Sequence, residues 1–345
     1  MDVVFAIPGD MMRRTGGFIY ESTVLRELRG LGHDVTHLRL PDGFPDPSGA
    51  EIERTRALLA AVSPATPILL DGFIPACIGA GALSTIPAPI VPIIHHPLGL
   101  ETGLPEGRAR ELLTAEAAAL ARVPRIVVPS PHTKRILVET FALEAGRIDI
   151  APPGFDRVTS VPVPTTPPTI LSVGLLAARK GHDVLLDALS QLVDLDWRAR
   201  IVGGTHDPAV ADALFLRARD PALAGRVTFT GPVSDADLRA EWDATSIFAL
   251  ATRYEGYGMV FGDAMLRGLP IVSCASGAVP DTVGDAARLV PPDDPAAFAD
   301  ALRGLLTDAQ ARADLSDRSA RRGATLPRWR DTAACVARAV ASVRP

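Results

Sequence analysis

A glycine-rich segment in the second half of the chain carries groups suited to binding both a diphosphate and hydroxyls. From residue 253 it reads RYEGYGMVFGDAM, between a predicted strand and a predicted helix. Gly256 and Gly258 let the backbone approach a ligand closely and turn N–H groups towards it, and the positive end of the helix attracts phosphate. Because like charges repel, the carboxylates of Glu255 and Asp263 suit hydroxyl groups better than phosphate. The segment predicts a nucleotide-sugar site, with a plain strand-to-helix turn as the alternative.

A second segment centres on Lys180, one of only two lysines in the chain, the other being Lys134. It lies in an Arg-Lys-Gly turn, six residues after Gly174, at the end of a predicted strand. An ammonium group in such a turn can neutralise a phosphate as a point charge. The alternative is an ordinary solvated lysine ahead of Asp183, which would cap the next helix.

Both segments resemble the signature of the retaining glycosyltransferases of family 4, which have the GT-B fold. That signature contains Glu-Gly-aromatic-Gly, a second Glu eight positions after the first, and Gly-x-Pro. The matching residues are Glu255, Gly256, Tyr257, Gly258, Ala264, Met265, Gly268 and Pro270. Asp263 stands where the family has the second Glu, and Leu175 stands where it has an Arg that grips the diphosphate together with the residue matching Lys180. The donor site is therefore a variant, in which Arg179 is a candidate substitute for the missing cation.

The resemblance assigns roles to individual residues. It implies that Glu255, Lys180 and His95 take part in catalysis, His95 being the histidine near the reacting carbon and His96 the runner-up. It places His96 and Glu101 in an acceptor pocket. The donor-binding residues that it implies are Gly17, Gly174, Arg179, Lys180, Val233, Glu255, Gly256, Tyr257, Gly258, Met259 and Asp263. The histidines could instead be structural.

Short apolar runs, such as 126–128 and 169–173, alternate with helical patterns along nearly the whole chain, which favours parallel sheets covered by helices. One predicted helix covers 20–31, and Gly16 and Gly17 before it resemble the Gly-Gly loop of the family. This alternation predicts an α/β protein with two Rossmann-like domains whose parallel sheets face each other across a cleft, and the resemblance implies the GT-B class. The predicted boundaries are an acceptor-side domain over 1–157, a proline-rich linker over 158–168 and a donor domain over 169–327. A last helix within 328–345 is expected to pack back across the hinge.

Composition narrows the classes of partner. The chain has 345 residues, a formal net charge of −5 and no run of like charges, which argues against nucleic acid as a partner. Three separated cysteines favour a reducing compartment, and the N-terminus has no basic leader, so we expect a cytoplasmic protein. Prolines break the apolar run over 86–94, so no transmembrane helix is expected; peripheral membrane contact stays open. We expect no metal site.

The expected reaction follows from the resemblance. It is the retaining, metal-independent transfer of a hexose-type sugar from a UDP- or GDP-linked donor to an acceptor hydroxyl, with no further cofactor. The acceptor is a small molecule, a glycan or a lipid. The alternatives are another GT-B enzyme, such as a nucleotide-sugar epimerase, and a non-catalytic GT-B partner subunit, which Asp263 and Leu175 motivate.

Overall fold

The computed structural model describes residues 1–101, 103–158, 162–163 and 165–343. The chain forms two compact units. Unit 1 comprises Met1–Gly154 and Pro327–Pro345, and unit 2 comprises Phe155–Leu326. Residues 159–161 and 164, within the segment predicted as a linker, lie outside the described residues.

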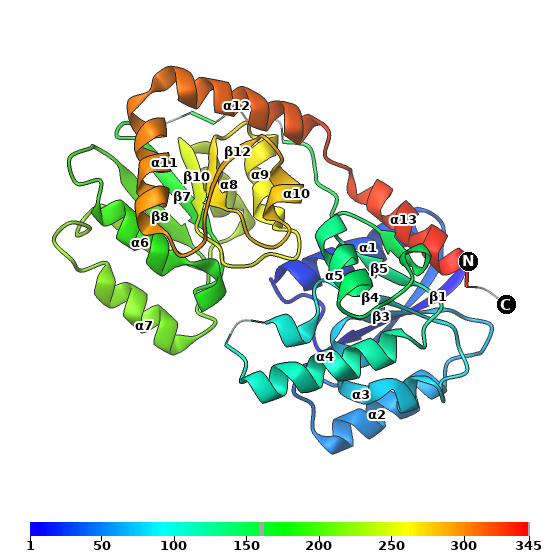
Figure 1. Ribbon diagram of the computed structural model, residues 1–345. Helices are drawn as coiled ribbons and strands as arrows, with labels where there is room; N and C mark the ends of the chain where they lie inside the picture. The colour runs from blue at the N-terminus through cyan, green and yellow to red at the C-terminus, as the bar shows by residue number, and fades with distance from the viewer. Residues whose placement is uncertain (102, 159–161, 164, 344–345) are drawn as a thin grey trace. The chain divides into compact units, whose positions relative to one another are not determined.

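Unit 1 contains a six-stranded parallel sheet in the order β2-β1-β3-β4-β5-β6 (Figure 1). Its strands are β1 (Asp2–Pro8), β2 (Asp34–Leu40), β3 (Ile68–Asp71), β4 (Ile90–Ile93), β5 (Ile126–Val128) and β6 (Ile148–Ile150). Its helices are α1 (Gly16–Gly30), α2 (Gly49–Ala60), α3 (Phe73–Leu83), α4 (Glu106–Leu120), α5 (Pro131–Glu139) and α13 (Trp329–Ala341). The central strands β3 and β4 have every residue buried and, apart from Asp71 at the end of β3, they are apolar, as expected where helices cover both faces of a parallel sheet.

Unit 2 contains a second six-stranded parallel sheet, in the order β12-β11-β10-β7-β8-β9. Its strands are β7 (Thr169–Val173), β8 (Arg198–Val202), β9 (Val227–Gly231), β10 (Ile247–Leu250), β11 (Ile271–Cys274) and β12 (Ala287–Val290). Its helices are α6 (His182–Ser190), α7 (Pro208–Arg217), α8 (Asp235–Asp243), α9 (Met259–Leu266), α10 (Val279–Val283), α11 (Pro295–Thr307) and α12 (Ala309–Ala324). Consecutive residues of one strand, such as Ile247 and Phe248, belong to different apolar clusters, so both faces of the sheet are covered.

The predicted alternation of strands and helices is confirmed. The strands expected at 126–128 and 169–173 have the observed bounds. The helix expected over Tyr20–Leu31 was placed too late, because Gly16 and Gly17 were interpreted as a loop. They form the first turn of α1, after Thr15 in the extended N-cap conformation. Glycine is tolerated there because the first N–H groups of a helix have no helical partner in any case.

The last helix, α13, belongs to unit 1. It packs on α1, and the hydroxyl of Thr332 donates to the carbonyl of Pro152 at 2.7 Å. Gly154 permits a close approach of two segments, since a Cβ there would lie 2.1 Å from the backbone nitrogen of Trp329. The chain thus leaves unit 1 at Gly154 and re-enters it at Pro327. Across the described residues, no helix combines the length and apolar character needed to cross a membrane.

Candidate active site

The loops after two neighbouring strands of unit 2 bring Lys180 and Glu255 together. β7 leads to the turn that carries Lys180, and its neighbour β10 leads to the loop that carries Glu255. Lys180 Nζ donates to Glu255 Oε1 at 2.5 Å, and the two residues are only 8% and 6% exposed. Two predicted site residues, 75 positions apart in the chain, therefore form one buried ion pair at the carboxyl edge of the sheet.

Neighbouring groups hold the Glu255 carboxylate in its charged form. Thr252 Oγ1 donates to Glu255 Oε1 at 3.1 Å, and Arg179 Nη1 lies 3.9 Å from Oε2. Burial alone raises the pKa of Glu255, but Lys180, Arg179 and the hydrogen bonds outweigh that effect and lower it. Glu255 is thus a fixed hydrogen-bond acceptor rather than a group that exchanges protons near neutral pH.

The segment after β11 fixes the glycine-rich loop through two hydrogen bonds. The Ala278 N–H donates to the Glu255 carbonyl at 2.8 Å, and Thr282 Oγ1 donates to the Tyr257 carbonyl at 2.6 Å. Gly277 has φ +52, and a Cβ there would lie 2.5 Å from the Glu255 carbonyl oxygen. Gly258, with φ +83, is the N-cap of α9. The loop is therefore held at the N-terminal end of α9, where free N–H groups and the helix dipole favour an anion.

Close contacts at two glycines fix the turn that carries Lys180. Gly181 has φ +63, and a Cβ there would lie 1.9 Å from the Ala251 carbonyl oxygen, so only glycine fits. The aliphatic stem of Lys180 lies over Gly174, where a Cβ would come within 3.2 Å of Lys180 Cδ. Both glycines therefore have steric roles in placing the ammonium group.

Arg253 links the two loops. Its N–H donates to the Arg179 carbonyl at 2.8 Å, and its guanidinium contacts Asp183 at 2.8 and 3.0 Å. Sequence reasoning missed Arg253, and it interpreted Asp183 only as a helix cap. The position of Arg253, a charged residue directly before the glycine-rich segment, could have indicated a role in the site.

The remaining predicted donor residues lie in the same unit but outside the ion pair. Asp263 is one turn into α9, with its side chain 43% exposed and Oδ1 3.8 Å from Arg267 Nη1. Val233, Tyr257 and Met259 are partly buried against the apolar cluster that contains Phe248. Their roles in donor binding stay predictions.

In unit 1, the structure brings Gly17 and His95 together. His95 follows β4, and a Cβ at Gly17 would lie 3.3 Å from the imidazole ring. The ring of Tyr20 packs edge-on against that of His95, with centroids 5.2 Å apart. Burial lowers the pKa of His95 to about 4, so the imidazole is neutral at pH 7.

Two buried acids adjoin His95 that sequence reasoning missed. Glu21 is 0% exposed, with Oε1 3.5 Å from His95 Nε2, and Asp71 is the last residue of β3. The available signals were the carboxylate at the end of an apolar strand and a glutamate four residues after Gly17. Helical spacing puts that glutamate on the same side of α1 as Gly17.

The residues expected in an acceptor pocket also contact each other. His96 Nε2 and Glu101 Oε2 are 3.1 Å apart, and His96 Nδ1 lies 3.0 Å from the Pro97 carbonyl oxygen. Glu116 of α4 holds the following turn, because its Oε2 accepts from the Leu98 N–H at 2.9 Å. Glu116 is fully buried, and burial raises its pKa to about 8.

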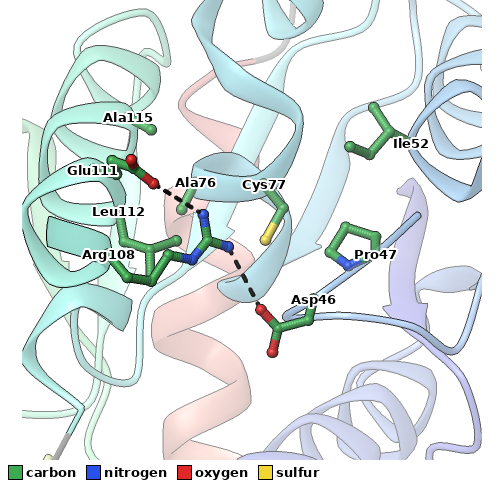
Figure 2. Close-up of a pocket in the computed structure, with 9 residues that line it drawn as sticks. All are labelled: Asp46, Pro47, Ile52, Ala76, Cys77, Arg108, Glu111, Leu112 and Ala115. Carbon is green, nitrogen blue, oxygen red and sulfur yellow. Dashed lines mark ion pairs between the residues drawn. The ribbon is translucent and has the colours of Figure 1, made fainter. Parts of the chain in front are cut away.

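Unit 1 also has a pocket of about 350 Å³ between α2, α3 and α4 (Figure 2). Arg108 contacts Asp46 and Glu111, each at 3.5 Å, so the charged groups of the lining pair with one another. The lining comprises Asp46, Pro47, Ile52, Ala76, Cys77, Arg108, Glu111, Leu112 and Ala115. None of these residues is among the predicted site residues.

Solved structures define the fold class. Sucrose-phosphate synthase from Thermosynechococcus elongatus aligns over 99% of each chain with a TM-score of 0.82 and 20% identity. Anabaena HepE, solved in complex with UDP-glucose, aligns over 99% of this chain and 100% of its own, with a TM-score of 0.80 and 16% identity. Together with the two parallel sheets, these similarities show that the chain has the GT-B fold.

Sequence comparisons point to a family on that fold. Residues 167–308 match the family of glycosyl transferases group 1. Mannosylfructose-phosphate synthase of Agrobacterium fabrum is 28% identical over 224 residues, which cover 55% of this chain and 49% of the relative. D-inositol 3-phosphate glycosyltransferase of Nocardia farcinica is 30% identical over 244 residues, which cover 63% of this chain and 54% of the relative. The chain spans about half the length of these curated relatives. The chain is therefore similar to group 1 glycosyl transferases over residues 167–308.

Proposed function

We propose that this chain is a retaining, metal-independent glycosyltransferase that moves a hexose-type sugar from a nucleotide-diphosphate donor to an acceptor hydroxyl. The observation that carries the proposal is the buried pair of Lys180 and Glu255 beside the N-terminal end of α9. Lys180 supplies a cation for the diphosphate, and Glu255, to which it is hydrogen-bonded, supplies an acceptor for the hydroxyls of the sugar. A nucleotide sugar offers both groups along a single molecule.

The chemistry required of unit 2 is electrostatic. As the bond between sugar and diphosphate breaks, negative charge develops on the leaving phosphate oxygen. Lys180 and the N–H groups at the start of α9 stabilise that charge, and the loops already hold them in place, so little reorganisation is needed. Arg179 is the proposed substitute for the arginine that the family has at the position of Leu175. Glu255 orients the sugar through its hydroxyls.

Retention of configuration and independence of metal are parts of the same proposal. A lysine and helix N–H groups supply the positive charge that a divalent metal supplies in other transferases. UDP-glucose is the first donor to test, because Anabaena HepE was solved with it. The names of the curated relatives include phosphorylated small molecules. Phosphorylated hexoses and D-inositol 3-phosphate therefore form the first acceptor panel.

The deciding experiment is calorimetric titration with UDP and GDP, followed by UDP-glucose and GDP-mannose turnover with and without EDTA. We expect one nucleotide to bind and its sugar to be hydrolysed or transferred, unchanged by EDTA. The product anomer, identified by NMR, tests retention. Binding without turnover of any donor would support the non-catalytic partner subunit. No binding of either nucleotide would refute the proposal.

A matched pair of variants tests the site itself. Glu255→Gln keeps the shape of the side chain but removes its charge, and should lower turnover at least about tenfold, or about 1.4 kcal/mol. Asp196→Asn removes an exposed carboxylate in the same unit and serves as the control. Equal turnover in the two folded variants would show that the site lies elsewhere.

A further inference from the structure

Glu21 and Asp71 form a buried group of acids in unit 1 that the proposed mechanism does not use. Glu21 is 0% and Asp71 4% exposed, and their carboxyl groups lie within hydrogen-bonding reach of each other. Among the described residues, neither acid has a lysine or arginine partner, and the basic side chain that contacts Glu21 is His95. Two buried carboxylates in contact without a cation cannot both stay ionised.

Both acids retain protons more readily than usual. Asp71 Oδ1 accepts from the Phe73 N–H at 2.7 Å, just before the first turn of α3, which favours a negative charge on Asp71. Burial and the neighbouring Glu21 nevertheless raise the pKa of Asp71 well above its ordinary value, and burial raises the pKa of Glu21 to about 8. The two carboxyl groups therefore share one proton and one negative charge.

His95 completes the arrangement. Its Nε2 is buried and 3.5 Å from Glu21 Oε1, while the side chain as a whole is 26% exposed. The solvent-exposed surface of the His95 side chain therefore belongs to atoms other than Nε2. The nearby titratable groups are His96, Tyr20, whose hydroxyl donates to the Ala151 carbonyl at 2.9 Å, and Cys335 beside Tyr20. None of these supplies a permanent positive charge.

We propose that Glu21 and Asp71 are positioning residues for His95. One shared proton joins the two carboxyl groups, and Glu21 Oε1 is the acceptor for the His95 Nε2–H. This chain of hydrogen bonds fixes the tautomer of His95, so that Nδ1 is left unprotonated, and it places one negative charge behind a neutral ring. A negative charge there stabilises positive charge that develops on a sugar carbon next to His95. The kinetic part of this inference rests on the proposed function; the arrangement of protons does not.

Amide substitutions test the sharing of one proton because they keep the shape of each side chain. In Glu21→Gln, the amide N–H₂ replaces the shared proton and Asp71 holds the charge. In Asp71→Asn, the amide donates to Glu21, which then holds the charge. Each single variant should therefore lower turnover about threefold. The double variant removes the charge and should lower turnover at least about thirtyfold, which is more than the product of the single effects. Glu139→Gln, on the surface of unit 1, is the control.

Nitrogen-15 NMR of labelled histidine gives a readout that does not depend on activity. His95, assigned by its loss in His95→Gln, should show a protonated Nε2 and an unprotonated Nδ1 in the unmodified protein at pH 7. A protonated Nδ1 would overturn the inference. Turnover losses that merely multiply in the double variant, or no loss in it, would overturn it as well. If the protein transfers no sugar, the NMR result still decides the proton arrangement, so the two proposals fail separately.

Discussion

Each unit contains a buried carboxylate at the carboxyl edge of its parallel sheet, but the two sites handle the charge in opposite ways. In unit 2, Glu255 is matched by Lys180 at 2.5 Å and by Arg179 at 3.9 Å, and its pKa is lowered. In unit 1, Glu21 meets another acid and a neutral histidine, and its pKa is raised to about 8. The first site holds permanent charges, whereas the second holds a proton.

The difference shows that the charged groups in contact with a buried carboxyl group, rather than its burial, decide whether it is ionised. Burial disfavours the ionised form in both places. A cation in contact reverses that effect in unit 2, and no cation is available to Glu21 among the residues described around it. Permanent charges suit a leaving diphosphate, and a retained proton suits the fixing of a histidine tautomer. Four substitutions test this contrast.

The largest effect is expected from Lys180→Met, which removes the cation but keeps much of the side-chain volume. Glu255 would then be buried with only Arg179 nearby, a situation that costs about 3 kcal/mol of unfolding free energy. Donor turnover should fall at least about 100-fold, because the leaving group loses its counter-charge. Urea unfolding and steady-state kinetics measure the two effects.

Lys134→Met is the matched control for that experiment. Lys134 is the only other lysine, and its Nζ donates to the Ile148 carbonyl at 2.7 Å in unit 1. Its loss should leave turnover within about twofold and cost about 1 kcal/mol, as for one hydrogen bond. If both lysine variants lose turnover equally, the contrast between the two units is wrong.

The second prediction concerns the backbone that holds the ion pair. Gly181→Ala places a Cβ 1.9 Å from the Ala251 carbonyl oxygen at φ +63. Because backbone must move, we expect unfolding free energy to fall by about 2 kcal/mol or more. Gly204→Ala, at a site with nothing within 4 Å of the new Cβ, should change it by less than about 0.5 kcal/mol. Urea unfolding of the two variants gives the comparison, and equal stabilities would contradict the steric role of Gly181.

The third prediction uses the sign of the raised pKa values in unit 1. Burial raises the pKa of Glu116 to about 8, so the folded protein retains a proton that the unfolded chain releases above its ordinary pKa. Its contribution to stability is full below pH 4.5 and is lost as the pH rises towards 8. Glu116→Gln, which still accepts from Leu98, should gain about 1 kcal/mol or more relative to the unmodified protein between pH 6 and pH 8. Urea unfolding at the two pH values checks this; parallel curves would show that Glu116 is ionised.

The smallest effect is expected from Asp263→Glu. The family has glutamate at this position, and the longer side chain should reach the ribose hydroxyls better. We expect the dissociation constant for the bound nucleotide to fall about threefold, or about 0.7 kcal/mol. Calorimetry measures it, with Asp243→Glu, in the neighbouring helix α8, as control. Weaker binding in Asp263→Glu would mean that Asp263 has a different role here.

Local sequence patterns were sufficient to predict most of the strands. Runs such as Thr169–Val173 are mostly apolar, rich in residues that favour strands, and bounded by proline and glycine. The start of α1 was wrong because a glycine pair has the same local appearance in a loop and in the first turn of a helix. Only Thr15 in the N-cap conformation resolved it.

The candidate site, too, was predicted only in part from the sequence. Glu255, Lys180 and the glycines between strand and helix were identified from residue type and spacing. Their contact was not, because it depends on β7 and β10 being neighbours in the sheet. In the sequence, β8 and β9 come between them, and strand order is decided by crossovers that local patterns do not encode.

By itself, the sequence determined the α/β class, the glycine turns beside Lys180 and Glu255, and the residues able to carry charge. These follow from apolar spacing over a few residues, from backbone sterics and from residue type. Only the tertiary structure decided that Glu255 has two cations while Glu21 has an acid and a histidine. Protonation depends on burial and on the charges within a few ångströms, and parallel strand order supplies those neighbours from distant parts of the chain.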